Sequence, residues 1–200
     1  WSYSPATRRV RRAPDITYDT LVNASPLIVV DQYGTFNGAQ DKYNWELKGV
    51  KKMVVAGVNN ALGNNPLEVT HGVGHLNPEY VSYEEKEVAV VHATLKDGQR
   101  HLYASRTFYV TTDAFFIVSQ DIYDGQGNLM RHALNTITTE VAGLDGGCTI
   151  NAEATFDFAT RQYAVNNMLG SAINSQPALY NGPSKDVSFY TPDGLRRYAR

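Results

Sequence analysis

The stretch from about residue 84 to residue 141 constrains the fold most, because strand-like patterns alternate there with tight-turn sequences. Glu87 to Leu95 and Arg100 to Val110 read as two strands, and Lys96-Asp97-Gly98-Gln99 lies between them. Asp-Gly tolerates a positive φ at both central positions, which a type I′ turn requires and which suits the twist of hairpin strands. The pattern predicts an antiparallel hairpin in which Lys96 faces Gln99, His92 faces Tyr103 and Val91 faces Ala104.

This register predicts two different faces. The first is core-like and is formed by Ala89, Val91, Ala93, Leu95, Leu102, Ala104 and Phe108. The second is apolar with polar tips, as in a face that lines a cavity, and is formed by Val88, Val90, His92, His101, Tyr103, Ser105 and Tyr109. Arg106 points to the core-like face, where an unpaired guanidinium would cost several kcal/mol. Arg106 is therefore expected either to have a carboxylate partner or to await an anionic head group inside a cavity.

Strand patterns continue on both sides of the hairpin. The expected strands are Tyr43–Lys48 and Lys52–Val55, joined as a hairpin around Gly49, followed by Phe115–Val118, Leu129–Thr139, Thr149–Phe158 and Gln162–Asn166. Strands near ten residues exceed the usual ~5–6, and long strands in a meander must twist and curl. The sequence predicts a mainly β (α+β) fold, a long-stranded antiparallel meander curled towards a barrel or half-barrel.

Helical patterns are scarce. Thr191, Pro192 and Asp193 are a suitable N-cap, first helical residue and first-turn acid for a short helix near the end of the chain. Residues 59–78, rich in Asn and Gly, predict a long loop. Nothing marks a domain boundary, so residues 1–200 are expected to form a single domain.

Composition excludes several classes of protein. Lys and Arg number 18 against 20 Asp and Glu, which argues against non-specific nucleic-acid binding. The longest apolar runs, such as Leu27–Val30, are too short to span a bilayer. The single cysteine, Cys148, excludes an intramolecular disulfide and every multi-cysteine metal site, and is interpreted as a small buried hydrophobe.

Three groups of residues are candidates for a chemical site, and none is predicted to be catalytic, to bind a metal or to hold a cofactor. His71 and His75 are separated by two glycines, which favours a solvated loop over a helical metal site. His92 and His101 share a face, but the sequence places no carboxylate beside either ring to support a hydrolase. Residues 121–128 do not have the ligand spacing of an EF-hand loop, so a polar hairpin loop is expected there.

Arg8, Arg9, Arg11 and Arg12 form a dense basic cluster close to the start of the chain. One interpretation is a solvated edge whose charge discourages edge-to-edge pairing. The other is a docking patch for anionic lipid head groups or for an acidic partner.

Several short motifs, in a consistent order, resemble a Proteobacterial family of unknown function. They are residues 8–14, Phe36-Asn37-Gly38, residues 43–49, Arg100-His101-Leu102-Tyr103, Arg106-Thr107-Phe108-Tyr109, Asp121-Ile122-Tyr123-Asp124 and residues 191–197. They correspond to the carboxy-terminal half of a protein about twice as long. The family looks like a periplasmic relative of the lipoprotein carriers LolA and LolB. The aromatic-polar opening, Trp1-Ser2-Tyr3-Ser4-Pro5, is typical of the middle of a strand, so the 200 residues are likewise expected to be a piece of a longer chain.

The resemblance implies a LolA/LolB-like half-barrel over an apolar cavity, with helices closing it, and a secreted precursor. We expect a non-enzymatic periplasmic protein that binds or carries a lipid or another hydrophobic molecule. The alternatives are an assembly or scaffold subunit that docks to an envelope transporter or outer-membrane partner, and a hydrolase that uses His92 or His101. The expected ligand-binding residues on the face that is concave if the inferred register holds are Val88, Val90, Tyr103, Tyr109, Phe116 and Val118. Arg106, which points to the core-like face, is also expected to bind ligand if it awaits a head group.

Overall fold

The computed structural model of the protein describes residues 1–12, 15–22, 25–140, 146–168 and 182–199. These residues belong to two compact units. One comprises Trp1–Thr17 with Asn181–Arg200, and the other comprises Tyr18–Tyr180. Each unit is described by itself, and the single domain expected from the sequence stays a prediction.

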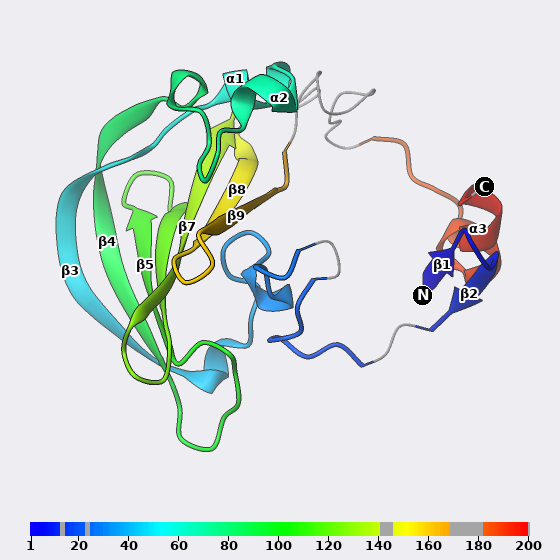
Figure 1. Ribbon diagram of the computed structural model, residues 1–200, viewed down its shortest axis with the longest axis horizontal. Helices are drawn as coiled ribbons and strands as arrows, with labels where there is room; N and C mark the ends of the chain where they lie inside the picture. Colours follow the sequence, from blue (N-terminus) through cyan, green and yellow to red (C-terminus); the bar gives the residue numbers. More distant parts are fainter. Residues whose placement is uncertain (13–14, 23–24, 141–145, 169–181, 200) are drawn as a thin grey trace. The chain divides into compact units, whose positions relative to one another are not determined.

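The larger unit is built on a seven-stranded antiparallel sheet in which every strand pairs with its neighbours in the sequence (Figure 1). Its strands are β3 (Tyr43–Ala56), β4 (Tyr83–Leu95), β5 (Ser105–Thr111), β6 (Ile117–Tyr123), β7 (Leu129–Thr138), β8 (Thr149–Asp157) and β9 (Gln162–Asn166). The predicted long-stranded meander is confirmed. The chain reverses between successive strands at residues 112–116, 124–128 and 158–161.

The sheet curls strongly, as Figure 1 shows for β3 and β4. Val55 of β3, Val88 of β4 and Val118 of β6 lie in one buried cluster although β3 and β6 are not neighbours in the sheet. Just after β3, Val58 forms an isolated parallel bridge with Ile137 of β7. The side that carries Val55, Val88 and Val118 is therefore concave, and the opposite side is called the outer face. The sheet does not close, so the predicted half-barrel is confirmed.

The β4–β5 register differs from the predicted one by four residues. Val91 pairs with Phe108 rather than with Ala104, and residues 96–104 form a loop between the strands. Only Gly98 of the two central turn residues has a positive φ, +79°, so the turn is not of type I′. Because side chains alternate with a period of two, an even shift leaves each strand residue on its predicted face.

The expected hairpin around Gly49 is wrong. Residues 43–56 form one continuous strand, β3, and the register slips between Leu47 and Gly49. Gly49 has a φ of +128°. This glycine accommodates a β-bulge, because the long partner strand β4 continues on both sides of it.

Short helices and loops cover part of the concave face. The expected long loop at residues 59–78 contains α1 (Asn60–Asn64) and α2 (Leu67–Thr70), and η3 (Pro78–Tyr80) follows. Leu62, Leu76 and Val81 from this segment form a buried cluster with Ala152 and Ala154 of β8. The segment thus covers the concave face at β8, the role that the resemblance gave to helices.

The outer face is covered by residues 25–42, here called the strap, which includes η1 (Val30–Gln32) and η2 (Gln40–Lys42). The ring of Phe36 contacts the ring of Phe108 at 5.5 Å between centroids. Val29 is buried with Tyr103 and Ile122. No strand or helix pattern predicted this element.

The smaller unit contains the hairpin β1 (Ser2–Ser4) and β2 (Arg9–Arg11), with η4 (Val187–Tyr190) and α3 (Pro192–Tyr198). The predicted cap is confirmed, because the Thr191 hydroxyl accepts a hydrogen bond from the Gly194 N–H at 3.0 Å. None of the helices in the described part of the chain has the length and hydropathy that crossing a membrane requires. Cys148 is exposed rather than buried, because it lies just before β8 begins.

Candidate functional site

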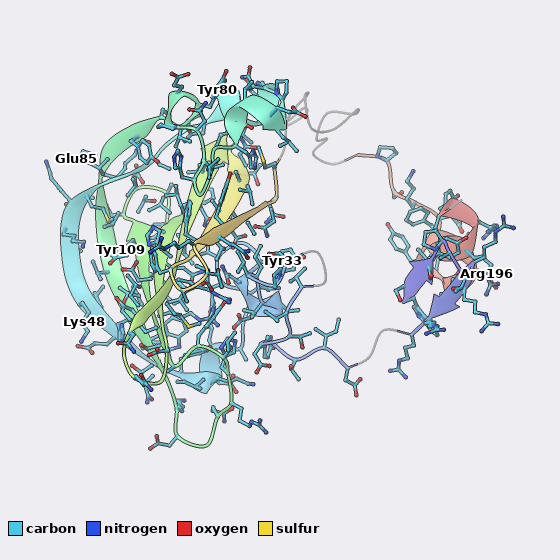
Figure 2. The ribbon with its side chains drawn as sticks, viewed as in Figure 1. Tyr33, Lys48, Tyr80, Glu85, Tyr109 and Arg196 are labelled. Atoms are coloured by element: carbon cyan, nitrogen blue, oxygen red, sulfur yellow. The ribbon has the colours of Figure 1, made fainter. Side chains whose placement is uncertain are left out.

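Five of the expected ligand-binding residues lie on the concave face. Val88 and Val118 are fully buried there, and Tyr109 and Phe116 pack against them while staying partly exposed. Val90 is also partly exposed and pairs with Tyr109 across β4 and β5. In Figure 2, Tyr109 lies inside the curve of the sheet and Tyr33 lies in the strap. Their role in binding stays a prediction.

Tyr103 does not lie on the concave face. It belongs to the 96–104 loop, outside β5, so the alternation that placed it opposite His92 does not apply. Its side chain is fully buried against Val29 of the strap and Ile122. Its hydroxyl donates a hydrogen bond to Oε1 of Gln32 at 3.0 Å.

Arg106 lies on the face opposite to the concave one, as the parity of its register predicts, and it is fully buried. Its Nη2 donates to Oδ2 of Asp31 at 2.5 Å and to the hydroxyl of Tyr43 at 3.1 Å. Its guanidinium lies 4.9 Å from the centre of the Tyr103 ring. Of the two alternatives left by the sequence, the structure shows the carboxylate partner.

His101 also lies in this buried cluster, with its Nε2 3.1 Å from Oδ2 of Asp31. The expectation that neither His92 nor His101 has a neighbouring carboxylate is therefore wrong for His101. His92 instead bonds through Nδ1 to Oγ1 of Thr107 at 2.9 Å. Neither histidine has a nucleophile together with a carboxylate among the described residues.

Polar side chains hold the strap on the outer face. Nε2 of Gln32 donates to Oγ1 of Thr155 at 2.6 Å. The backbone N–H groups of Gly34 and Thr35 donate to the carboxylate of Glu153 at 3.2 and 3.3 Å. Burial raises the pKa of Glu153 to about 7, although these hydrogen bonds act in the opposite direction. This face is a structural interface between the strap and β5–β8.

A second polar cluster lies on the concave face and was not predicted. Asp121 Oδ1 is 2.7 Å from Nδ1 of His132, and the Tyr109 hydroxyl donates to Asp121 Oδ2 at 2.7 Å. Oγ of Ser119 is 3.1 Å from Nε2 of His132. Burial alone would raise the pKa of Asp121, but the hydrogen bonds from His132 and Tyr109 outweigh it and hold that pKa below its usual value.

The order Ser119–His132–Asp121 matches the connectivity of a catalytic triad, but the surroundings of Ser119 do not suit a nucleophile. Ser119 lies within β6, is 3% exposed, and pairs with Tyr109 on one side and Leu134 on the other. Acyl transfer needs N–H groups that converge on the reacting oxygen, whereas N–H groups within a strand are directed into the ladder. The cluster is better explained as a network that orients His132.

Two hollows border the β8–β9 hairpin. The concave hollow, about 490 Å³, is lined by Gly74, His132, Phe156, Asp157, Phe158, Arg161 and Gln162. The edge hollow, about 670 Å³, lies beside β9, and its lining includes Leu27, Ile28, Tyr33, His71, Tyr163 and Arg161. Both volumes are within the usual range of ligand pockets.

His71 and His75 make local contacts. The ring of His71 stacks on Tyr163 at 6.1 Å between centroids, and Nδ1 of His75 is 2.7 Å from the carbonyl oxygen of Leu76. Within the described ranges, no three His, Cys, Asp or Glu side chains converge as metal ligands. In the 124–128 loop, Asp124 accepts hydrogen bonds from the backbone of Gln126 and Asn128.

The four clustered arginines surround the β1–β2 hairpin of the smaller unit. Arg9 and Arg11 lie on β2, Arg8 precedes it with a φ of 52°, and Arg12 follows it. All four are exposed. Arg8 lines a hollow of about 580 Å³ together with Arg196. Docking of a partner or head group at these arginines stays a prediction.

Comparison with known proteins relates the chain to one family. A family described as "Protein of unknown function (DUF1329)" matches residues 1–196. The uncharacterized protein PA3922 of Pseudomonas aeruginosa is 32% identical over 204 residues, which cover 98% of this chain and 43% of that protein. The chain thus spans less than half the length of this curated relative.

Two solved structures share the fold. One, from Vibrio parahaemolyticus, is described as an outer membrane lipoprotein-sorting protein domain; it has a TM-score of 0.50 and 13% identity, over 82% of this chain and 54% of that one. The other is a DUF1329 family protein from Desulfovibrio piger, with a TM-score of 0.50 and 16% identity, over 82% and 53% of the two chains. With the match over residues 1–196, the chain belongs to the DUF1329 family, and its sheet shares the fold of the Vibrio domain.

Proposed function

We propose that the protein is a non-enzymatic periplasmic protein that binds or carries a lipid or another hydrophobic molecule on the concave face of its half-barrel. The observation that carries the proposal is the concave hollow of about 490 Å³, which has Phe156 and Phe158 in its lining. Phe158 is 51% exposed, so its ring has apolar surface still to be covered. A concave apolar site with a few polar groups is the usual form of a small-molecule pocket.

Two further features support this assignment. The strap covers the outer face along β5–β8, and on the other side of β8 the concave hollow lies beside the partly exposed Phe158. The Vibrio domain of similar fold is described as a lipoprotein-sorting protein, and this similarity supports a periplasmic location and a carrier role.

The test combines native mass spectrometry with two matched variants. The protein, purified without detergent from the envelope of its producing cells, is expected to retain lipid-sized adducts. Phe158→Asp places a charge in the lining of the concave hollow and should reduce them at least tenfold. Val54→Asp, at an outward position that is 66% exposed, should leave them unchanged. A ligand-free mass for the wild type, or equal loss in both variants, would contradict the proposal.

A scaffold role is the second candidate, and one observation favours it. The edge strand β3 presents Leu47, Val50 and Val54 with exposures of 64%, 55% and 66%. An apolar row on an edge strand suits docking of a protein partner. A photo-crosslinking residue at position 54 should then give one discrete protein adduct in living cells, and the same residue at Arg100 should not. Lipid adducts without a cross-link would favour the carrier role.

A further inference from the structure

Arg161 lies where the two hollows adjoin. It lines both of them, together with Gly74 and Gln162. Its side chain is exposed, and Phe156 and Phe158 of the concave hollow stand close by in sequence at the end of β8. A single cation is thus placed beside aromatic surface.

The turn that presents Arg161 is held in place. Asp157 Oδ1 accepts hydrogen bonds from the N–H and the hydroxyl of Thr160 at 2.9 and 3.0 Å. Arg161 then adopts a φ of +55°, a left-handed conformation that is uncommon for residues other than glycine. Its backbone position is therefore determined by the turn and not by the side chain.

The acids close to Arg161 have other partners. Asp157 is the one acid in the described lining of the two hollows, and its Oδ2 pairs with Nε of Arg131 at 2.9 Å. Glu153, the next acid on β8, is fully buried and accepts the backbone N–H groups of the strap. Within the described residues, no hydrogen bond or ion pair involves the Arg161 guanidinium. Its positive charge is left without a counter-ion beside an apolar hollow.

We propose that Arg161 binds the anionic head group, a carboxylate or phosphate, of an amphiphile whose apolar chain lies in the concave hollow against Phe156 and Phe158. This inference rests on the proposed function and specifies its ligand. A guanidinium offers a planar fork of donors that matches both anions, and such charge-assisted hydrogen bonds are the strong ones. A neutral amphiphile would gain no comparable binding free energy from Arg161.

The experiment measures binding of oleate, oleyl alcohol and inorganic phosphate to the whole chain by titration at pH 8 and below micellar concentrations. The wild type should bind oleate at least tenfold more tightly than oleyl alcohol. Arg161→Gln should weaken oleate binding at least tenfold and leave oleyl alcohol unchanged. Arg100→Gln, an exposed arginine outside both hollows, is the matched control and should change neither. Arg161→Gly is a second variant that also removes the guanidinium. Glycine adopts the left-handed conformation without strain, so this variant should keep the fold of the turn.

The outcomes separate the two proposals. Binding of both amphiphiles with equal affinity, unchanged in Arg161→Gln and Arg161→Gly, would overturn the role of Arg161 and leave the carrier function standing. Binding of neither amphiphile would overturn the carrier function itself. Phosphate that binds as tightly as oleate and displaces it would indicate a site for a free anion. That result would overturn the proposal that the ligand is an amphiphile.

Discussion

Replacing Arg106 alone should destabilise the larger unit strongly. Arg106→Leu would leave Asp31, which is 1% exposed, as a buried carboxylate that has lost its 2.5 Å partner. Breaking a buried ion pair in this way costs about 3–5 kcal/mol of unfolding free energy. All variants are compared at the same pH, because His101 also contacts Asp31.

Removing both charges should restore most of that loss. The pair is incompletely hydrogen-bonded, because Nε and Nη1 of Arg106 and Oδ1 of Asp31 have no partner among the described residues. Replacing such a pair with apolar residues is often neutral or stabilising. The double variant Asp31→Leu with Arg106→Leu should therefore unfold within about 1.5 kcal/mol of the wild type.

Urea unfolding followed by tryptophan fluorescence suits this test. Trp45 lies 5.4 Å from the ring of Phe36 in the strap, and Trp1→Phe removes the other of the two tryptophans. Arg100→Leu, at an exposed position, is the control and should change stability by less than about 0.5 kcal/mol. The reasoning would be refuted if Arg106→Leu matched that control, or if the double variant were no more stable than the single one.

Three further predictions concern other parts of the chain. Because the folded state raises the pKa of Glu153 from its usual 4.5 to about 7, it binds more protons than the unfolded state in that range, so stability should fall as pH rises from 5 to 8. Urea unfolding should show a fall about 2.5 kcal/mol larger in the wild type than in Glu153→Gln, and equal pH profiles of the two proteins would contradict the prediction. A fluorophosphonate probe should label the wild type no more than it labels a Ser119→Ala variant. Labelling of the wild type that is lost in both Ser119→Ala and His132→Ala would instead indicate a hydrolase. Gly194→Ala should lower the free energy of opening of α3, measured by hydrogen exchange, by about 1–3 kcal/mol. The reason is that a Cβ there would collide with the carbonyl oxygens of Ser188 and Phe189. Arg197→Ala on the same helix should not open it.

The strand content of the fold was predictable because its signals are local. The sequence pattern identified the strands at Glu87–Leu95, Leu129–Thr139, Thr149–Phe158 and Gln162–Asn166. Gly49 was misread because a positive φ serves a bulge as well as a turn, and only the length of the partner strand distinguishes them. The predicted β4–β5 register was wrong by four residues. Because this shift is even, each strand residue still lies on its predicted face of the sheet.

The strap and the Asp121 cluster could not be predicted in the same way. Gln32 and Thr155 are 123 residues apart, and Asp31 and Arg106 are 75 apart, so no local pattern connects them. Asp121 and His132 face each other only through the β6–β7 register, which the sequence of the 124–128 loop does not determine. Arg106 itself was a usable clue, because an arginine on an apolar face needs a partner.

The polar character of the outer face has a consequence for the order of assembly. Each hairpin of the meander joins neighbouring segments, whereas the strap must find Tyr103, Arg106, Glu153 and Thr155 on a sheet that already exists. Contacts at such separations form late, because the loop must close before they contribute. Until then, the uncovered face exposes an arginine and a glutamate among apolar side chains such as Phe108 and Ile122. These charged groups keep water on the face and divide its apolar surface, which opposes its association with another unfolded chain.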